Sequence, residues 1–200
     1  MMIKKRLSSR ILPSDARKLN KRLRKEINAK ASKAVKNAKN LMLREFDAHP
    51  VTKEINGGPH ATNVSGTLGG KGNLFSFIGF SNGDRPTREV RELLQNSTKL
   101  IGIRKTMKGD LGFQIVIDLP NKEEIKRASP LPWAAARSWV VGIEQGLSGL
   151  GQYLVKPGAG RSGGGIEIKG TLRSGKFKNT KYVSAILANL QGNLMKFLKK

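Results

Sequence analysis

One glycine-rich stretch, Gly66-Thr-Leu-Gly-Gly-Lys-Gly72, has the composition of a phosphate-binding loop. A P-loop needs the spacing G-x-x-x-x-G-K-[ST], in which the last Ser or Thr contacts the magnesium ion. The spacing differs here, and Gly72 stands where that hydroxyl residue is required. We therefore predict no nucleotide site and interpret this stretch as a glycine-punctuated loop.

A second stretch, Gly158-Ala-Gly-Arg-Ser-Gly163, matches G-x-G-x-x-G letter by letter. In dinucleotide-binding proteins this motif joins a strand to a helix inside a βαβ unit. Pro157 precedes the motif here, and no amphipathic helix follows it. We interpret it as a basic loop, in which Arg161 contacts phosphate or an acidic neighbour.

Two histidines and one glutamate complete the candidates for catalysis or metal binding. His49 and His60 are the only histidines, they stand eleven residues apart, and cysteine is absent. A metal site is therefore not predicted. Glu144 follows an apolar segment and is the best candidate for a buried carboxylate, but no nucleophile or second carboxylate accompanies it. We expect Glu144 to pair with a Lys or Arg rather than to act as a general acid or base, and we expect neither enzymatic activity nor a cofactor.

The chain is strongly basic. Its 200 residues include 38 Lys and Arg against 14 Asp and Glu, which gives a formal net charge of +24. Such a charge calls for polyanionic partners, such as DNA, RNA, an anionic membrane or an acidic protein surface. Aromatic residues are scarce, which disfavours base stacking on single strands. No helix-turn-helix, zinc-finger or RNP signature appears. Contact with the phosphate backbone is therefore the mode of nucleic-acid binding that the sequence still allows.

No apolar run approaches the roughly 18 residues that a membrane-spanning helix needs. The first residues, Met-Met-Ile-Lys-Lys-Arg-Leu, also lack the apolar core of a signal peptide. We expect a soluble protein that is made in the cytoplasm and has no membrane partner. Trp133 and Trp139 are most simply anchors of a core or of an interface.

The order of elements predicts an α+β fold, in which a long N-terminal helix packs on a small, mainly antiparallel β-sheet. A long loop and a C-terminal helix follow. We expect residues 1–12 to form a basic arm that becomes ordered on a partner. We expect residues 13–200 to form a single domain, with an extended glycine-rich loop at residues 146–175.

The first helix is predicted from Ser14, a capping residue, to about Phe46. Its apolar positions recur at steps of three and four, which is the period of one helix face; they include Leu19, Leu23, Ile27, Ala31, Val35, Ala38 and Met42. Its other faces are almost purely basic, and we assign a polyanion contact to Lys21, Arg22, Arg24 and Lys25. A solvated face with extended Lys and Arg side chains is the alternative reading.

The remaining elements are predicted from periodicity and turn residues. Pro50 ends the first helix, because the residue before a proline avoids the α region, and one further helical turn is expected over Pro50–Ile55. The other expected elements are a strand at Leu74–Phe80, a helix at Thr87–Gln95, a hairpin of Lys99–Thr106 with Leu111–Leu119, a helix capped by Asn121 that ends at Arg127, a strand at Ser138–Ile143, a brief strand at Gly165–Lys169 and a helix at Thr180–Lys199.

This order of parts resembles the tail-completion and neck proteins of tailed bacteriophages, which join the head to the tail. In that family a long Lys/Ala-rich helix is followed by a loop that reads Thr-Gly-x-Leu, then by a strand, a β-hairpin and a strand that ends in Glu-x-Gly. Here Ser65-Gly66-Thr67-Leu68 stands at the loop, and Glu144-Gln145-Gly146 stands at the strand end. Ser65 replaces the usual Thr, and an additional helix precedes the hairpin.

The resemblance implies a non-enzymatic virion protein that forms a homo-oligomeric ring around the DNA channel as a connector, neck or tail terminator. Its partners would be other neck, portal or adaptor, and tail-tube proteins, with non-specific contact to duplex DNA. The implied assembly residues are Ser65, Gly66, Thr67, Leu68, Glu144 and Gly146, and we expect Trp139 to join them as an interface anchor. The alternative is a basic protein that binds nucleic acid without sequence specificity.

Overall fold

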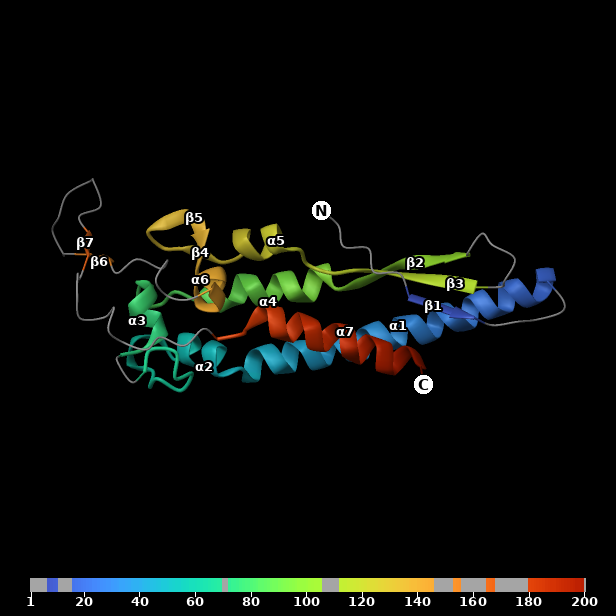
Figure 1. The fold of residues 1–200 in the computed structure, drawn as a ribbon, viewed down its shortest axis with the longest axis horizontal. Helices are drawn as coiled ribbons and strands as arrows, with labels where there is room; N and C mark the ends of the chain where they lie inside the picture. Colours follow the sequence, from blue (N-terminus) through green and yellow to red (C-terminus); the bar gives the residue numbers. More distant parts are fainter. Residues whose placement is uncertain are drawn as a thin grey trace.

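A computed structural model describes residues 7–10, 16–69, 72–105, 112–145, 153–155, 165–167 and 180–199. The fold is α+β, as the sequence predicts: a long N-terminal helix, small antiparallel sheets and a C-terminal helix. The molecule is elongated along its first helix, and the other elements gather along and at one end of that helix (Figure 1). Within the described residues, no helix combines the length and hydrophobicity needed to cross a bilayer.

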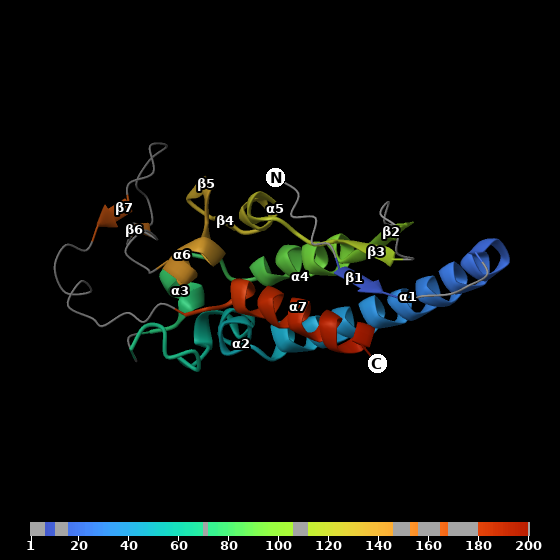
Figure 2. The ribbon, with the colours of Figure 1, turned by 45° about the vertical axis from the view of Figure 1, so that its right-hand side comes forward.

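The first helix, α1, runs from Ala16 to Ala48 and confirms the predicted helix. It stops one residue before His49, whose extended backbone (φ −62°, ψ 135°) precedes Pro50. The C-terminal helix α7, Val183–Lys199, lies back along α1 (Figures 1 and 2). The buried face of α1 is built partly from small residues, Ala31, Ala34 and Ala38, and small side chains permit such a close approach of two helices.

The sheet beside α1 has the order β1-β3-β2 and is antiparallel throughout. β2, Lys99–Lys105, and β3, Gly112–Asp118, confirm the predicted hairpin, whose turn lies outside the described residues. β1, Leu7–Arg10, pairs with β3. The expectation that residues 1–12 form an arm ordered only by a partner is therefore wrong for these four residues, because the free edge of β3 supplies their hydrogen bonds.

The segment after the glycine-rich loop is a helix, α3 (Leu74–Ile78), where the sequence predicted a strand. Asn73 caps its start by accepting the N–H of Ser76 at 2.9 Å. Gly79 ends it in the left-handed region at φ 89°. These two capping residues stabilise a helix, although the aromatic residues between them favour a strand. Buried Leu74, Phe75 and Ile78 show a helical spacing rather than an alternating one.

In the segment around the two tryptophans, a strand precedes Trp139 and a helix follows, whereas a strand was expected from Ser138 to Ile143. Ala134–Ser138 forms strand β5, which pairs with β4 (Pro130–Leu131), and Trp139–Gln145 forms helix α6. The strand predicted at Ser138–Ile143 is therefore wrong. Ser138 accepts the N–H of Val141 at 3.2 Å, and this N-cap starts a helix despite the β-branched residues that follow.

The remaining elements complete the body of the molecule. The short helix α2, Pro50–Asn56, and the 3-10 turn η1, Gly58–His60, follow α1. Helix α4, Pro86–Ser97, and helix α5, Lys122–Arg127, confirm two predicted helices, and Asn121 forms a capping box with Glu124. β6, Tyr153–Val155, pairs with β7, Gly165–Glu167, within the expected glycine-rich loop. The other residues of that loop, including Gly146 and Arg161, lie outside the described residues.

One core of buried side chains runs through the structure. It includes Met42 and Phe46 of α1, residues of α2 to α6 and of the sheet, and Leu190 and Leu194 of α7. The N-terminal part of α1 extends past the end of α7 and alongside the sheet (Figures 1 and 2). On that projecting part, Leu23 and Ile27 are only partly buried.

Candidate functional site

A buried carboxylate holds the Ser65–Leu68 loop in place. Glu54 of α2 is fully buried. One of its oxygens accepts the N–H of Ser65 at 2.8 Å, and the other accepts the N–H of Leu74 at 2.7 Å. Hydrogen bonds to an ionised acceptor are among the stronger ones in proteins. Glu54 therefore fixes both ends of the glycine-rich connection between α2 and α3.

The loop is also bonded within itself. The Ser65 hydroxyl donates to the Thr67 hydroxyl at 2.8 Å, and the Thr67 N–H donates to the Ser65 hydroxyl at 3.2 Å. Gly66 between them has φ 65°, a conformation that is costly for residues with a side chain. Leu68 is 1% exposed and packs into the core. Thr67 and Leu68 are thus turned inward, while Ser65 is partly exposed; their proposed role in assembly stays a prediction.

A second carboxylate caps the helix that closes the fold. Glu144 of α6 accepts the N–H of Tyr182 at 3.2 Å and the N–H of Ser184 at 2.7 Å. The first N–H groups of a helix lack partners inside the helix, and a carboxylate there also favours the helix dipole. The expectation that Glu144 lies at a strand end and pairs with a Lys or Arg is therefore corrected. It lies in a helix, and its partners are the two main-chain groups at the start of α7.

Tyr182, whose N–H is bonded to Glu144, places its side chain in the core beside α1 and α2. Its side chain is fully buried, its hydroxyl lies 2.6 Å from the Thr52 hydroxyl, and its ring centroid lies 5.7 Å from that of Phe46 and 4.7 Å from that of His49. Burial raises the pKa of the Tyr182 phenol above its ordinary range, so the group stays protonated. The Thr67 hydroxyl meets that of Thr180 at 3.2 Å, two residues before Tyr182.

These groups form a junction between α2, the loop, α6 and α7. We call it the carboxylate junction and define it as Thr52, Glu54, Ser65, Thr67, Glu144, Thr180 and Tyr182. Every hydrogen bond described for its two carboxylates comes from main-chain N–H groups, which makes the junction a fastening of backbone segments. In the described part of the chain, no group of three or more His, Cys, Asp or Glu side chains is arranged to hold a metal ion.

Trp139 was expected among the assembly residues, but it is 0% exposed. Its ring centroid lies 6.2 Å from those of Phe80 and Tyr182. Its indole N–H has no hydrogen-bond partner within the described residues. Trp139 is therefore a core residue of this chain and not a surface contact. Trp133 is partly exposed and donates its indole N–H to the carbonyl of Ile78 at 3.1 Å.

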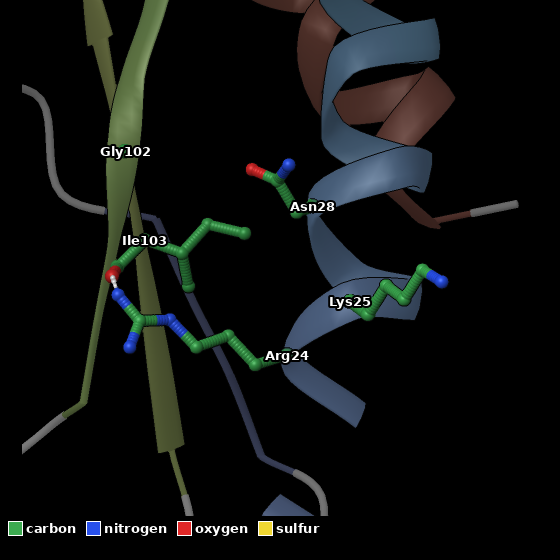
Figure 3. A pocket seen from close by; sticks show the side chains of 5 residues that line it. All are labelled: Arg24, Lys25, Asn28, Gly102 and Ile103. Carbon is green, nitrogen blue, oxygen red and sulfur yellow. Dashed lines mark hydrogen bonds between the residues drawn. The ribbon is translucent and has the colours of Figure 1, made fainter. Parts of the chain in front are cut away.

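The predicted polyanion contacts lie at the opposite end of the molecule from the junction. Lys21, Arg22, Arg24 and Lys25 are consecutive or nearly consecutive residues of α1. Arg22 pairs with Glu26 at 3.3 Å, both being highly exposed. Arg24 and Lys25 line a pocket of about 480 Å³ between α1 and β2, together with Asn28, Gly102 and Ile103 (Figure 3).

No protein-family model, curated protein or solved structure matches this chain. The resemblance to neck proteins is therefore supported by the short sequence segments alone. Two of those segments differ from the family pattern in the structure, because a helix follows the Ser65–Leu68 loop and Glu144 lies in a helix.

The junction residues that were not predicted as site residues are Thr52, Glu54, Thr180 and Tyr182. A signal for Glu54 does exist: it stands between the apolar positions Val51 and Ile55 on one face of α2, where a carboxylate is out of place unless it is hydrogen-bonded. Nothing local indicates its partners, which lie 11 and 20 residues away along the chain.

Proposed function

We propose that this chain is a non-enzymatic structural subunit of a head–tail connector, neck or tail-terminator ring in a tailed phage. In this role identical copies surround the channel through which DNA leaves the capsid, and they contact portal or adaptor proteins on one side and tail-tube proteins on the other. The protein would be located in the virion and be made in the host cytoplasm.

The projecting part of α1 is the observation that supports assembly most directly. Leu23 and Ile27 continue the apolar stripe of α1 beyond the end of α7, and both are only partly covered. Ile101, on the neighbouring edge strand β2, is 54% exposed, and Met195 of α7 is 39% exposed. A stripe of this kind gains stability when a neighbouring subunit removes it from water.

The carboxylate junction supplies the rigid platform that a ring subunit needs. It fastens α7 and the Ser65–Leu68 loop to α2 and α6 through hydrogen bonds to buried or partly buried carboxylates. Identical subunits can then repeat one heterologous contact around an axis until the ring closes. A loose loop or a detached α7 would let the contact angle vary, and the ring would not close reliably.

A second candidate function is non-specific binding of nucleic acid, and the basic surface of α1 favours it. Between Ala16 and Arg44 the only carboxylate is Glu26, and it is already paired with Arg22. In a ring, the same charge would offset the passing duplex or acidic neighbours. Binding to duplex DNA is therefore expected for both functions. The oligomeric state of the chain and its location in the particle distinguish them.

The test has two parts. Mass photometry of the purified chain, alone and with the complex of its neighbouring proteins, is expected to show discrete rings or monomers that assemble on that complex. Negative-stain images of particles labelled with an antibody to this chain are expected to show label at the head–tail junction. A chain that stays monomeric with every neighbour and is absent from mature particles would overturn the proposal in favour of the second candidate.

A further inference from the structure

A basic pocket lies where the projecting part of α1 passes the edge strand β2. Arg24 crosses from α1 to β2, and its guanidinium donates to the carbonyl oxygen of Ile103 at 3.4 Å (Figure 3). Asn28 and the Ile103 side chain point into the space between the two elements, whereas Lys25 stands at the rim and is directed away from the strand. The pocket has a volume of about 480 Å³ and no carboxylate among its lining residues.

The lining side chains present the donors of Arg24, Lys25 and Asn28, and the one side-chain acceptor among them is the neutral amide oxygen of Asn28. A guanidinium has five N–H groups in a planar fork, and the single long bond to Ile103 orients Arg24 without using up its donors. Among the described residues Arg24 and Lys25 form no ion pair. The Asn28 amide adds a neutral donor beside them. This combination suits an oxyanion, which accepts hydrogen bonds from a guanidinium and an amide together.

Further cations extend from the pocket along the exposed side of α1. Lys33 and Lys36 are exposed and lie on the side of the helix away from the core. Lys25, at the rim of the pocket, lies on the same side of α1 as Lys36, with Lys33 close to that side, whereas Arg24 lies on the side that faces β2. The row from Lys25 to Lys36 covers about 16 Å, at a rise of about 1.5 Å per residue. Because Glu26 is neutralised by Arg22, no free negative charge interrupts this row.

We propose that the pocket binds one phosphodiester of duplex nucleic acid, with Lys33 and Lys36 contacting further phosphates of the same duplex. A uniform row of cations matches a polymer that carries one charge at every phosphate. An acidic peptide would instead favour cations mixed with apolar pockets for its side chains. Single strands are disfavoured, because no aromatic residue lines the pocket for base stacking. The inference rests on the polyanion contact proposed for α1, and it does not depend on ring formation.

Gly102, on the strand side of the pocket, can be replaced without steric conflict. Gly102 lines the pocket, its φ is not positive, and a Cβ built on it meets no heavy atom within 4 Å. Gly102→Asp therefore places a competing carboxylate at the pocket without crowding the backbone. Gly102→Ala is its uncharged control. Lys53→Ala, at the far end of the molecule on an exposed site of α2, controls for the loss of one positive charge.

The experiment measures fluorescence anisotropy of a labelled duplex with the full chain at several salt concentrations. Each lost phosphate contact lowers the slope of log K against log salt by about 0.9. We expect Arg24→Ala to lower the slope by about that amount and Gly102→Asp to weaken binding several-fold, uniformly over duplex sequences. Gly102→Ala and Lys53→Ala are expected to leave the slope close to wild type.

Three results would overturn the proposal: equal effects of Arg24→Ala and Lys53→Ala, no effect of Gly102→Asp, or tighter binding of an acidic peptide than of the duplex. Mass photometry of the same variants reports separately on assembly. Rings that form normally from a variant with weakened duplex binding would support the pocket and leave the ring proposal untouched. Loss of rings with unchanged duplex binding would count against the pocket alone.

Discussion

Glu54 is the residue on which the arrangement of the loop depends most. It is fully buried, and both of its carboxylate oxygens accept main-chain N–H groups. A buried donor that loses its acceptor costs far more than an average hydrogen bond contributes. The contribution of Glu54 to stability is therefore the free energy that would be lost if the N–H groups of Ser65 and Leu74 had no acceptor.

Replacing Glu54 tests this directly. Glu54→Gln keeps one acceptor oxygen and turns the other into a donor, so one N–H loses its partner. We expect unfolding free energy to fall by about 1–3 kcal/mol for Glu54→Gln and by more for Glu54→Ala. Urea denaturation followed by circular dichroism measures the change. Lys53→Ala, next to it but exposed, should stay within about 0.5 kcal/mol of wild type; a Glu54→Gln variant as stable as that control would contradict the argument.

His49 is expected to make the stability of the fold depend on pH. Its Nδ1 accepts the N–H of Val51 at 3.2 Å, which requires the neutral ring. Burial lowers the pKa of His49, and a hydrogen bond to the backbone of Lys181 opposes that shift in part. The unfolded chain therefore binds a proton on His49 more readily than the folded chain does. Stability is expected to be constant above the unfolded pKa of about 6.5 and to fall as pH decreases below it.

This expectation is checked by melting temperatures between pH 5 and pH 8. His49→Asn retains an acceptor for the Val51 N–H, because Asn is a good capping residue, and it cannot be protonated. The variant should lose part of the decrease below pH 6.5 that wild type shows. The exposed His60→Gln is the control and should keep the wild-type profile. Identical profiles for wild type and His49→Asn would show that this group does not sense pH.

At the level of elements, a hydroxyl pair joins α2 to the residue that directly precedes α7. Thr52 and Tyr182 are both fully buried, and their hydroxyls lie 2.6 Å apart. Either single replacement, Thr52→Val or Tyr182→Phe, leaves the other hydroxyl without its partner, at a cost of about 1–3 kcal/mol. The double replacement removes both polar groups and should cost less than the sum of the two single ones.

A double-mutant cycle by urea denaturation measures that difference. We expect a coupling free energy of about 0.5–3 kcal/mol between the two sites, as for residues in direct contact. Tyr182→Phe combined with the exposed Lys53→Ala is the matched cycle and should be additive. Additivity of Thr52→Val and Tyr182→Phe would mean that the hydroxyl pair does not join α2 to α7.

The long elements could be predicted from the sequence. Helix α1, helix α4 and the β2–β3 hairpin follow from periodicity, because long amphipathic patterns have one favourable way to bury their apolar residues. Periodicity failed at α3 and α6, which are short and rich in aromatic and β-branched residues. There the caps at Asn73 and Ser138 determine the structure.

The candidate site was predicted only in part, for a related reason. The Ser65–Leu68 loop and Glu144 stand out locally in the sequence, through glycine spacing and an apolar neighbourhood. Their partners are in other elements: Glu54 reaches Leu74 across 20 residues, and Glu144 reaches Ser184 across 40. Such pairings depend on tertiary packing, so they cannot be predicted from a short segment of the sequence.

At the scale of the whole molecule, the exposed aliphatic residues occur toward both ends. Val64, in the loop after α2, and Ile101, on β2, are each 54% exposed, and these two elements lie toward opposite ends of the long axis (Figure 1). A heterologous ring contact joins two different surfaces of neighbouring copies. The proposed ring is therefore expected to bring the loop end of one copy against the sheet end of the next.

Two charged variants test this arrangement. Val64→Asp should block one surface and Ile101→Asp the other, so neither variant forms rings alone. Mixed together, the two variants still share one intact contact and should give heterodimers by native mass spectrometry. Asn37→Asp, on an exposed position of α1, should assemble like wild type. Rings from either variant alone, or no heterodimer in the mixture, would exclude these surfaces as the contact.

The packing of α7 against α1 also has a consequence for synthesis. Met42, Phe46 and the buried alanines of α1 belong to a core that includes α7, an element encoded far downstream. During translation α1 therefore leaves the ribosome before α7, and its apolar face stays exposed to solvent until α7 emerges. Chaperone occupancy of the nascent chain should be highest in this interval, and native structure should appear only after α7, Val183–Lys199, has left the ribosome.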